Sequence, residues 1–368
     1  MSDLPGELVE EILSRVPLTS LTAARSTCKP WNAYLRYRNQ FSGYVVIDSE
    51  LFSLEINIEL ERFRIKQVSI VNREICEVFQ WDGLLLCVIE DDRWRFVWNP
   101  YLRQIKWIKP INDSHKFHTS DMYALGYEDM NNNNGRNHKI LRLLDVSKCS
   151  SLLPFYEMYD FYSDSWKILH VNPGCSIKSG CVSLKGNSYF LGQEEGKSTN
   201  IIICFDFTKE RFGRRFALPF GTRSQETKTV ILSCVRDEQL AVLHLSKDHT
   251  MEIFIIRNIQ TSWSWSWSKF LRVELEPSSS IVEAVSFVIH EEKKIALVSE
   301  SHKSSRACII GVDGYFKSVN IREAWKHGLE CCYNQVVFSS YAANSVELHS
   351  NESGASPWYG WLLPASML

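Results

Sequence analysis

The sequence lacks any long hydrophobic run. Its longest apolar stretches, such as 84–89 and 201–205, are far shorter than the roughly 20 residues of a transmembrane helix. Met1 is soon followed by the acidic Asp3 rather than by the apolar core of a signal peptide. We therefore expect an intracellular protein, in the nucleus and/or the cytoplasm, without a membrane partner.

An excess of charge of either sign is missing as well. The 41 Lys and Arg residues nearly balance the 43 Asp and Glu residues, and the formal net charge is -2 at pH 7. Nucleic-acid-binding proteins neutralise phosphates with clustered cations, and anionic lipid surfaces attract such clusters too. The composition therefore does not support nucleic acid or anionic lipid as the main ligand.

Metal-ligand spacings are also absent, since the sequence contains no Cys-x-x-Cys. The eleven cysteines are an odd number and are scattered through apolar runs, as at Cys87 and Cys204, which is typical of reduced core thiols. His115 and His118 lie three residues apart in a polar stretch, where a solvated loop is the simpler interpretation. We predict no metal site and no cofactor.

Sequence motifs of common catalytic sites are missing too. There is no GxSxG nucleophile turn, HExxH helix or phosphate-binding loop. Asp82, Asp160, Asp206 and Asp313 recur near predicted hairpin turns. Glycosidases use carboxylate pairs, but aspartate also favours turns because its side chain bonds the nearby backbone. We assign these aspartates to turns and predict no catalytic residue.

The N-terminus does contain a clear helical pattern. Leu4, Leu8, Ile12 and Val16 recur at steps of four, and Pro17 ends the segment. This spacing predicts an amphipathic helix with one apolar stripe.

Two shorter helices are predicted after Pro17. Ser20 can cap one that runs toward Cys28, and the other presents Trp31 and Tyr34. A unit of roughly 40 residues is close to the lower limit for independent folding. The apolar stripe must therefore be covered, either by a second protein or by the remainder of this chain.

These N-terminal residues resemble an F-box in the form common in plants. The resemblance is carried by Leu4-Pro5, Leu8, Glu11-Ile12-Leu13, Val16-Pro17, Ser20-Leu21, Arg25, Thr27-Cys28-Lys29 and Trp31-Asn32. It implies binding to a Skp-type adaptor and, through it, to a cullin and a RING protein. The implied adaptor-binding residues are Leu4, Pro5, Leu8, Val9, Ile12, Leu13, Val16, Pro17, Leu21, Cys28 and Trp31.

From about residue 44 the helical period gives way to short apolar strands separated by turns. First-hairpin turns near residues 83, 130, 186, 237 and 292 recur about every fifty residues, which is typical of four-stranded propeller blades. Stretches 44–48, 67–71 and 333–348 are expected to join into one more blade that closes the ring. We predict a mostly β protein with a small N-terminal α unit and a β-propeller-like domain of about five to six blades. A two-layer sandwich or an irregular open sheet is the alternative.

The body of the chain also resembles a known family over roughly residues 76 to 335. Segments such as GLLLCV, VWNP, ALGYE, YDFYSDSWK, CFDFTKERFG and SWSKFLRV are similar to the plant F-box-associated type 1 domain. The resemblance implies a propeller-like module that faces a substrate. The expected units are the F-box at 1–42, a connector with possible closing strands at 43–75, the propeller-like domain at 76–349 and a flexible tail at 350–368.

Three tryptophans form the most conspicuous local pattern. Trp263, Trp265 and Trp267 alternate with serine, so in a strand all three rings would lie on one side. Two interpretations are open. The rings can pack between neighbouring blades, or they can form a substrate-binding surface, since tryptophan is enriched at binding hot spots.

Two functions from different classes fit these observations. The first is a non-catalytic substrate-recognition subunit of an SCF-type (Skp-cullin-F-box) E3 ubiquitin ligase, with a protein as its substrate. The second is a propeller enzyme of the glycosidase or sialidase kind with an unrelated helical leader. The Ser-x-Asp-x-Gly-x-Thr-Trp turns of sialidases are absent, which favours the first.

Overall fold

The computed structural model describes a β domain that begins at residue 40. The described residues are 40–47, 49–57, 62–68, 70–81, 83–89, 94–100, 102–111, 121–130, 136–144, 156–194, 196, 199–220, 227–235, 239–256, 266–275, 284–291, 293–300, 306–320 and 334–339. All the predicted adaptor-binding residues lie outside this set, as do Trp263, Trp265, His115, His118 and the predicted tail at 350–368.

The described strands form six four-stranded antiparallel sheets. In chain order they are β1 (Gln40–Ile47), β2 (Glu50–Asn57), β3 (Arg62–Gln67), β4 (Ile75–Trp81), β5 (Leu84–Ile89), β6 (Arg95–Asn99), β7 (Gln104–Ile108), β8 (Met122–Asp129), β9 (Arg136–Leu143), β10 (Tyr156–Asp160), β11 (Ser165–Leu169), β12 (Cys175–Leu184), β13 (Asn187–Glu194), β14 (Asn200–Asp206), β15 (Arg211–Ala217), β16 (Thr227–Val235), β17 (Gln239–Ser246), β18 (Thr250–Ile256), β19 (Trp267–Glu274), β20 (Ala284–His290), β21 (Ile295–Glu300), β22 (Arg306–Gly311), β23 (Phe316–Asn320) and β24 (Asn334–Ser339).

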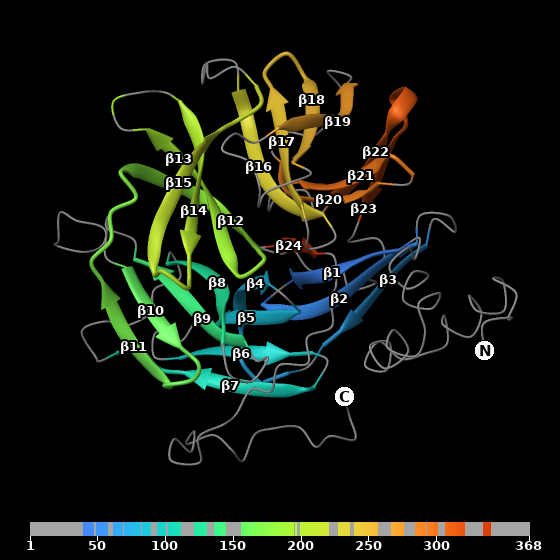
Figure 1. Cartoon of the computed structure of the whole chain (residues 1–368). Coiled ribbons are helices and arrows are strands. Elements are labelled where there is room, and N and C mark those ends of the chain that lie inside the picture. The colour runs from blue at the N-terminus through green and yellow to red at the C-terminus, as the bar shows by residue number, and fades with distance from the viewer. Residues whose placement is uncertain are drawn as a thin grey trace, which may run out of the picture.

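The six sheets are the blades of a β-propeller (Figure 1). The first strands of neighbouring blades contact one another in the order β4, β8, β12, β16, β20 and β24, and β24 contacts β4 in turn. These strands therefore surround the central axis, and the last strand of each blade is outermost. The propeller prediction is confirmed at six blades, and the sandwich alternative is wrong.

One blade is assembled from both ends of the chain. Its strand order is β24-β1-β2-β3, and β24 pairs antiparallel with β1, with Ser339 opposite Ser42 and Asn334 opposite Ile47. This pairing covers the inner edge of β1, which would otherwise be an unpaired strand edge. The predicted ring closure is confirmed.

Two strands of the closing blade were not predicted. The sequence predicts a strand at 67–71, whereas β3 ends at Gln67 and is preceded by β2. β2 alternates buried Phe52, Leu54 and Ile56 with partly exposed Ser53 and Glu55. β3 is an outermost strand rich in Arg and Lys, so its sequence carries little of the hydrophobic pattern that marks a buried strand.

The antiparallel pairing gives the ring two faces. The terminal face is the one at which β1 begins, at Gln40, and β24 ends, at Ser339. In the other five blades the innermost strand ends, and the second strand begins, on this same face, because all the innermost strands run in one direction along the axis. The last strand of a blade ends on the opposite face, where the innermost strand of the next blade begins.

The core lies between the blades rather than in one central cluster. One group of buried side chains joins the β8–β11 and β12–β15 blades, with Leu141 and Met158 against Phe205 and Phe207. Another joins the β16–β19 and β20–β23 blades through Ile253 and Phe287. Among the described residues, no helix has the length and apolar character needed to cross a membrane.

Candidate functional site

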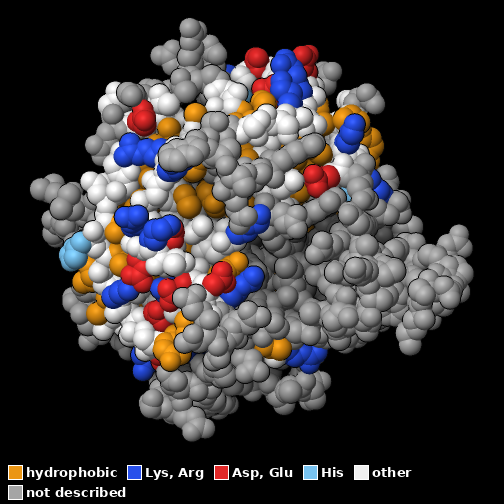
Figure 2. Space-filling view, viewed as in Figure 1, with side chains coloured by type: hydrophobic (Ala, Val, Ile, Leu, Met, Phe, Trp, Pro, Cys, Tyr) orange, Lys and Arg blue, Asp and Glu red, His pale blue; other side chains and the backbone are white. Residues whose placement is uncertain are grey.

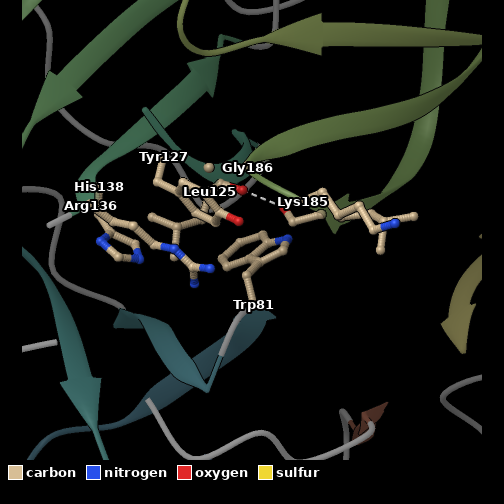
Figure 3. Close-up of a pocket in the computed structure, with 10 residues that line it drawn as sticks. Trp81, Leu125, Tyr127, Arg136, His138, Lys185 and Gly186 are labelled. Atoms are coloured by element: carbon tan, nitrogen blue, oxygen red, sulfur yellow. Dashed lines mark hydrogen bonds between the residues drawn. The ribbon is translucent and has the colours of Figure 1, made fainter. Parts of the chain in front are cut away.

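A pocket of about 170 Å³ lies on the terminal face, near the propeller axis (Figure 3). It is formed where β4 ends, where β8 turns into β9 and where β12 turns into β13. Three consecutive blades therefore contribute to it. The described residues that line it are Trp81, Leu125, Gly126, Tyr127, Arg136, His138, Ser183, Leu184, Lys185 and Gly186.

Two glycines allow the β8–β11 and β12–β15 blades to approach closely enough to form the back of the pocket. A Cβ on Gly126 would lie 2.1 Å from Cδ2 of Phe207. Gly186 has φ +79°, and a Cβ there would lie 2.8 Å from the backbone oxygen of Tyr127. The Tyr127 N–H donates to the Gly186 carbonyl at 3.1 Å, so the two blades bond directly through their backbones.

The pocket combines a rigid aromatic wall with cations. Trp81 is only 5% exposed and stacks on Phe79 with ring centroids 5.4 Å apart. The Arg136 guanidinium carbon lies 4.2 Å from the centroid of the Tyr127 ring, which is a cation–π contact. Figure 3 shows the Arg136 guanidinium between Tyr127 and Trp81, while Lys185 extends away on the other side of Trp81.

A polar cluster fixes the elements beside the pocket. Lys139 is 3% exposed, and its Nζ lies 2.9 Å from Glu128 Oε2 and 3.0 Å from Glu210 Oε1 of the next blade. Asn137 donates to Glu128 Oε1 at 2.9 Å and to Asp160 Oδ2 at 3.0 Å. β8, β9, β10 and the β14–β15 turn are thereby joined. In Figure 2 acidic and basic side chains are interleaved over this part of the surface.

The pKa values in this cluster reflect the competition between burial and pairing. Burial opposes the charged form of Lys139, but hydrogen bonds to Glu128 and Glu210 outweigh burial and raise its pKa. Burial alone would raise the pKa of Glu210, yet the ammonium groups of Lys167 and Lys139 hold it below its ordinary value. Both shifts favour the charged forms of Lys139 and Glu210 at neutral pH, so this pair acts as a structural support.

A second ionic group lies deeper in the same blade. Arg142, Asp121 and Glu157 are each 0% exposed at their side chains. Arg142 donates to Asp121 Oδ2 from Nη2 at 2.6 Å and from Nε at 2.9 Å, and to Glu157 Oε2 from Nη1 at 2.7 Å. These bonds connect β9, β10 and the residue that precedes β8.

Two of the predicted turn aspartates have the role assigned to them. Asp160 Oδ1 accepts the backbone N–H groups of Tyr162 and Ser163, both at 2.9 Å. Asp206 Oδ1 accepts those of Thr208 and Lys209, at 3.1 and 2.9 Å. Each aspartate ends the third strand of its blade, so the two occupy equivalent positions and the turn prediction is confirmed for both. Asp82 lies outside the described residues, and the side chain of Asp313 does too.

Trp267 begins β19, the outermost strand of its blade, and its indole Nε1 donates to the Ala217 carbonyl at the end of β15, at 3.1 Å. Trp166 does the same from β11, donating to the Lys109 carbonyl just after β7 at 2.6 Å. The two tryptophans therefore occupy equivalent positions and bridge each blade to the one before it. Whether Trp263, Trp265 and Trp267 contact a substrate stays a prediction.

The described cysteines lie in strands, and none of them stands out as a nucleophilic thiol. Burial raises the pKa of Cys181 to about 12, and burial likewise raises the pKa of Cys204 to about 12. Within the part of the chain that the structure describes, no three His, Cys, Asp or Glu side chains are grouped so that they could hold a metal ion.

Comparison with known proteins identifies both parts of the chain. Residues 1–41 match the F-box domain, and residues 42–348 match the F-box associated beta propeller domain. The chain thus belongs to the F-box proteins with an F-box-associated β-propeller domain.

Relatives from Arabidopsis thaliana share this organisation over nearly their whole length. F-box protein At1g66490 is 44% identical, with 95% of this chain and 99% of the relative covered. F-box/kelch-repeat protein At3g13680 is 42% identical, with 96% and 98% covered. Among solved structures, TolB from Acinetobacter baumannii matches with a TM-score of 0.42 and 12% identity over 77% of this chain and 63% of TolB, a likeness too weak to carry an argument.

Proposed function

We propose that this protein is the substrate-recognition subunit of an SCF-type E3 ubiquitin ligase, acting in the nucleus or cytoplasm. The F-box helices bind a Skp-type adaptor, and the adaptor connects the chain to a cullin and a RING protein. The propeller binds a protein substrate. The chain itself is not an enzyme, because the associated proteins supply the ubiquitin chemistry and the receptor contributes proximity.

The observation that carries this proposal is the direct succession of two modules. The F-box match ends at residue 41, and the propeller match begins at residue 42. β1 starts at Gln40, so the F-box segment is followed directly by the first strand of the ring. A small adaptor-binding unit joined to a closed, loop-rich ring is the arrangement expected of a receptor that connects two other proteins.

Adaptor binding is tested by charging the predicted apolar stripe. The double variant Leu8→Asp, Ile12→Asp should lose co-purification with a co-expressed Skp-type adaptor, since two carboxylates would be buried in the interface. Glu7→Gln with Glu10→Gln, on the opposite side of the predicted helix, is the matched control and should retain the adaptor. Undiminished binding by the double aspartate variant would refute the proposed adaptor surface, and glycoside hydrolysis by the purified chain alone would refute the receptor function.

For the substrate side, we retain Trp263, Trp265 and Trp267 as candidate contacts. Trp263 and Trp265 lie in the chain between β18 and β19, and in the described residues β18 ends and β19 begins on the terminal face. Replacement of Trp263 and Trp265 by alanine should reduce capture of the substrate while the unfolding temperature is kept. A variant that unfolds instead would show that the rings only pack within the protein.

A further inference from the structure

We infer that the terminal-face pocket binds an acidic peptide segment, in which a carboxylate or phosphate group pairs with Arg136 and an adjacent apolar side chain packs on Trp81. This inference rests on the proposed receptor function and names the chemistry of the substrate segment. The ligand is a short stretch of a partner protein.

The size of the pocket excludes larger ligands. Sites for drug-sized molecules and cofactors usually measure about 300 to 1,000 Å³, whereas this pocket measures about 170 Å³. A space of this size accepts one or two side chains of a peptide whose backbone stays at the surface.

The charge of the lining selects for anions. Its described residues include two cations, Arg136 and Lys185, and no Asp or Glu. Arg136 is half-exposed and lies 4.0 Å from the exposed side chain of Asp129, so an anionic ligand would compete with this carboxylate for the guanidinium. A guanidinium presents a planar fork that matches both carboxylate and phosphate oxygens. The chain as a whole has a formal charge of -2, so the preference for an anion is local.

The rest of the lining favours an apolar neighbour beside the anion. The Gly186 carbonyl already accepts the Tyr127 N–H, and the Leu125 carbonyl already accepts the hydroxyls of Ser183 and Ser188. These two backbone carbonyls are therefore satisfied within the protein, and Trp81, Leu125 and Leu184 provide apolar surface in the lining. Trp81 is held in place by its stacking on Phe79, and the ligand's apolar side chain would contact the small part of the ring that remains exposed.

The test measures peptide binding to the full chain co-purified with its Skp-type adaptor. The probes are three fluorescein-labelled peptides in one Gly-Ser background, with the central sequences Glu-Leu-Glu, phosphoserine-Leu-phosphoserine and Gln-Leu-Gln. Fluorescence anisotropy should give at least tenfold tighter binding for one or both of the anionic peptides than for the Gln peptide. The stronger of the two identifies the source of the anion.

Variants connect the effect to the pocket. Arg136→Gln should remove the tenfold preference, and Lys185→Gln should reduce it. Arg103→Gln, an exposed cation in the β6–β7 turn outside the pocket, should leave it unchanged. If Arg136→Gln fails to fold, Lys185→Gln and the comparison among the three peptides still decide the question. Equal affinities for all three peptides, or an unchanged preference in the folded Arg136→Gln variant, would overturn the inference.

The same preparations separate this inference from the proposed function. Adaptor co-purification depends on the F-box residues and should be identical in the parent chain and in all the pocket variants. Retained adaptor without any anion preference would overturn only the peptide assignment. Failure of the parent chain to hold the adaptor would overturn the receptor function itself.

Discussion

The ion triad of Arg142, Asp121 and Glu157 makes the most demanding prediction. Arg142→Met removes the only cation of this triad while leaving both carboxylates in place. All three side chains are fully buried, and three hydrogen bonds of 2.6 to 2.9 Å join them. Methionine fills similar space but cannot donate a hydrogen bond, so Asp121 and Glu157 lose their guanidinium partner in a dry environment.

The expected cost follows from this burial. Breaking a buried ion pair by removing one partner typically destabilises a protein by about 3 to 5 kcal/mol. For a domain of about 300 residues, whose unfolding entropy is roughly 0.6 kcal/mol/K, about 4 kcal/mol corresponds to a fall in unfolding temperature of roughly 6 °C. Lys269→Met is the matched control, because Lys269 pairs with Glu252 at 2.7 Å but is about half-exposed. Loss of an exposed pair should cost less than about 1 kcal/mol.

The assay is urea unfolding of the full chain at pH 7, followed by far-UV circular dichroism and intrinsic fluorescence. Adding Asp121→Asn and Glu157→Gln to Arg142→Met should recover part of the lost stability, because neutral amides tolerate burial better than carboxylates. The reasoning is refuted if Arg142→Met unfolds within about 1 kcal/mol of the parent chain, or if the triple variant is less stable than the single one.

Three further predictions concern the contacts between blades. Trp166→Phe and Trp267→Phe should each lower the free energy of unfolding by about 1 kcal/mol, since each loses an indole hydrogen bond to the preceding blade; urea titration measures this. Acidification should destabilise the protein, because the pKa values of Asp160 and Glu210 are lowered in the folded state. The contribution of these two carboxylates to the free energy of unfolding is complete above about pH 5 and is lost as the pH falls below about 4. The slope of unfolding free energy against pH should be smaller in Glu210→Gln. Gly126→Ala should destabilise by about 1 to 3 kcal/mol, since its methyl group overlaps Phe207, and thermal unfolding measures this.

Each of these predictions has an outcome that would contradict it. Full stability of both phenylalanine variants would mean that the indole bonds are replaced by water at no cost. An identical pH slope in the parent and Glu210→Gln would remove Glu210 from the acid response. Gly126→Ala with an unchanged unfolding temperature would show that the two blades can separate slightly without losing their packing.

The sequence predicted those parts of the β architecture that are indicated by residues close together in the chain. Gly83 and Gly186 lie in first-hairpin turns and have positive φ values of 76° and 79°. Turn residues of this kind can be recognised in the sequence itself, and their spacing of about fifty residues indicates the blades. Asp160 and Asp206 were assigned correctly for the same reason, because each bonds to backbone only two or three residues away. The predicted closing stretch at 333–348 contains β24, which runs only from Asn334 to Ser339.

The pocket and the ion triad could not be predicted in this way. Trp81, Tyr127 and Lys185 are distant in sequence and meet only because three blades pack side by side. Arg142 stands in a run of strand residues where a charged side chain ordinarily faces water, and its burial depends on Asp121 from another segment. A Gly next to an aromatic residue, as at Gly126 and Tyr127, was the one local sign of a close approach between blades.

The pairing of β24 with β1 has a consequence for how the protein is made. β1 is synthesised among the first strands, whereas β24, which pairs with its inner edge, follows about 290 residues later. Synthesis of that length takes roughly 15 to 60 s at ordinary rates of translation. Throughout that interval the inner edge of the first blade has no partner from its own chain. Folding on the ribosome must therefore finish with the last strand, and we expect nascent chains to depend on chaperones until residue 339 has emerged.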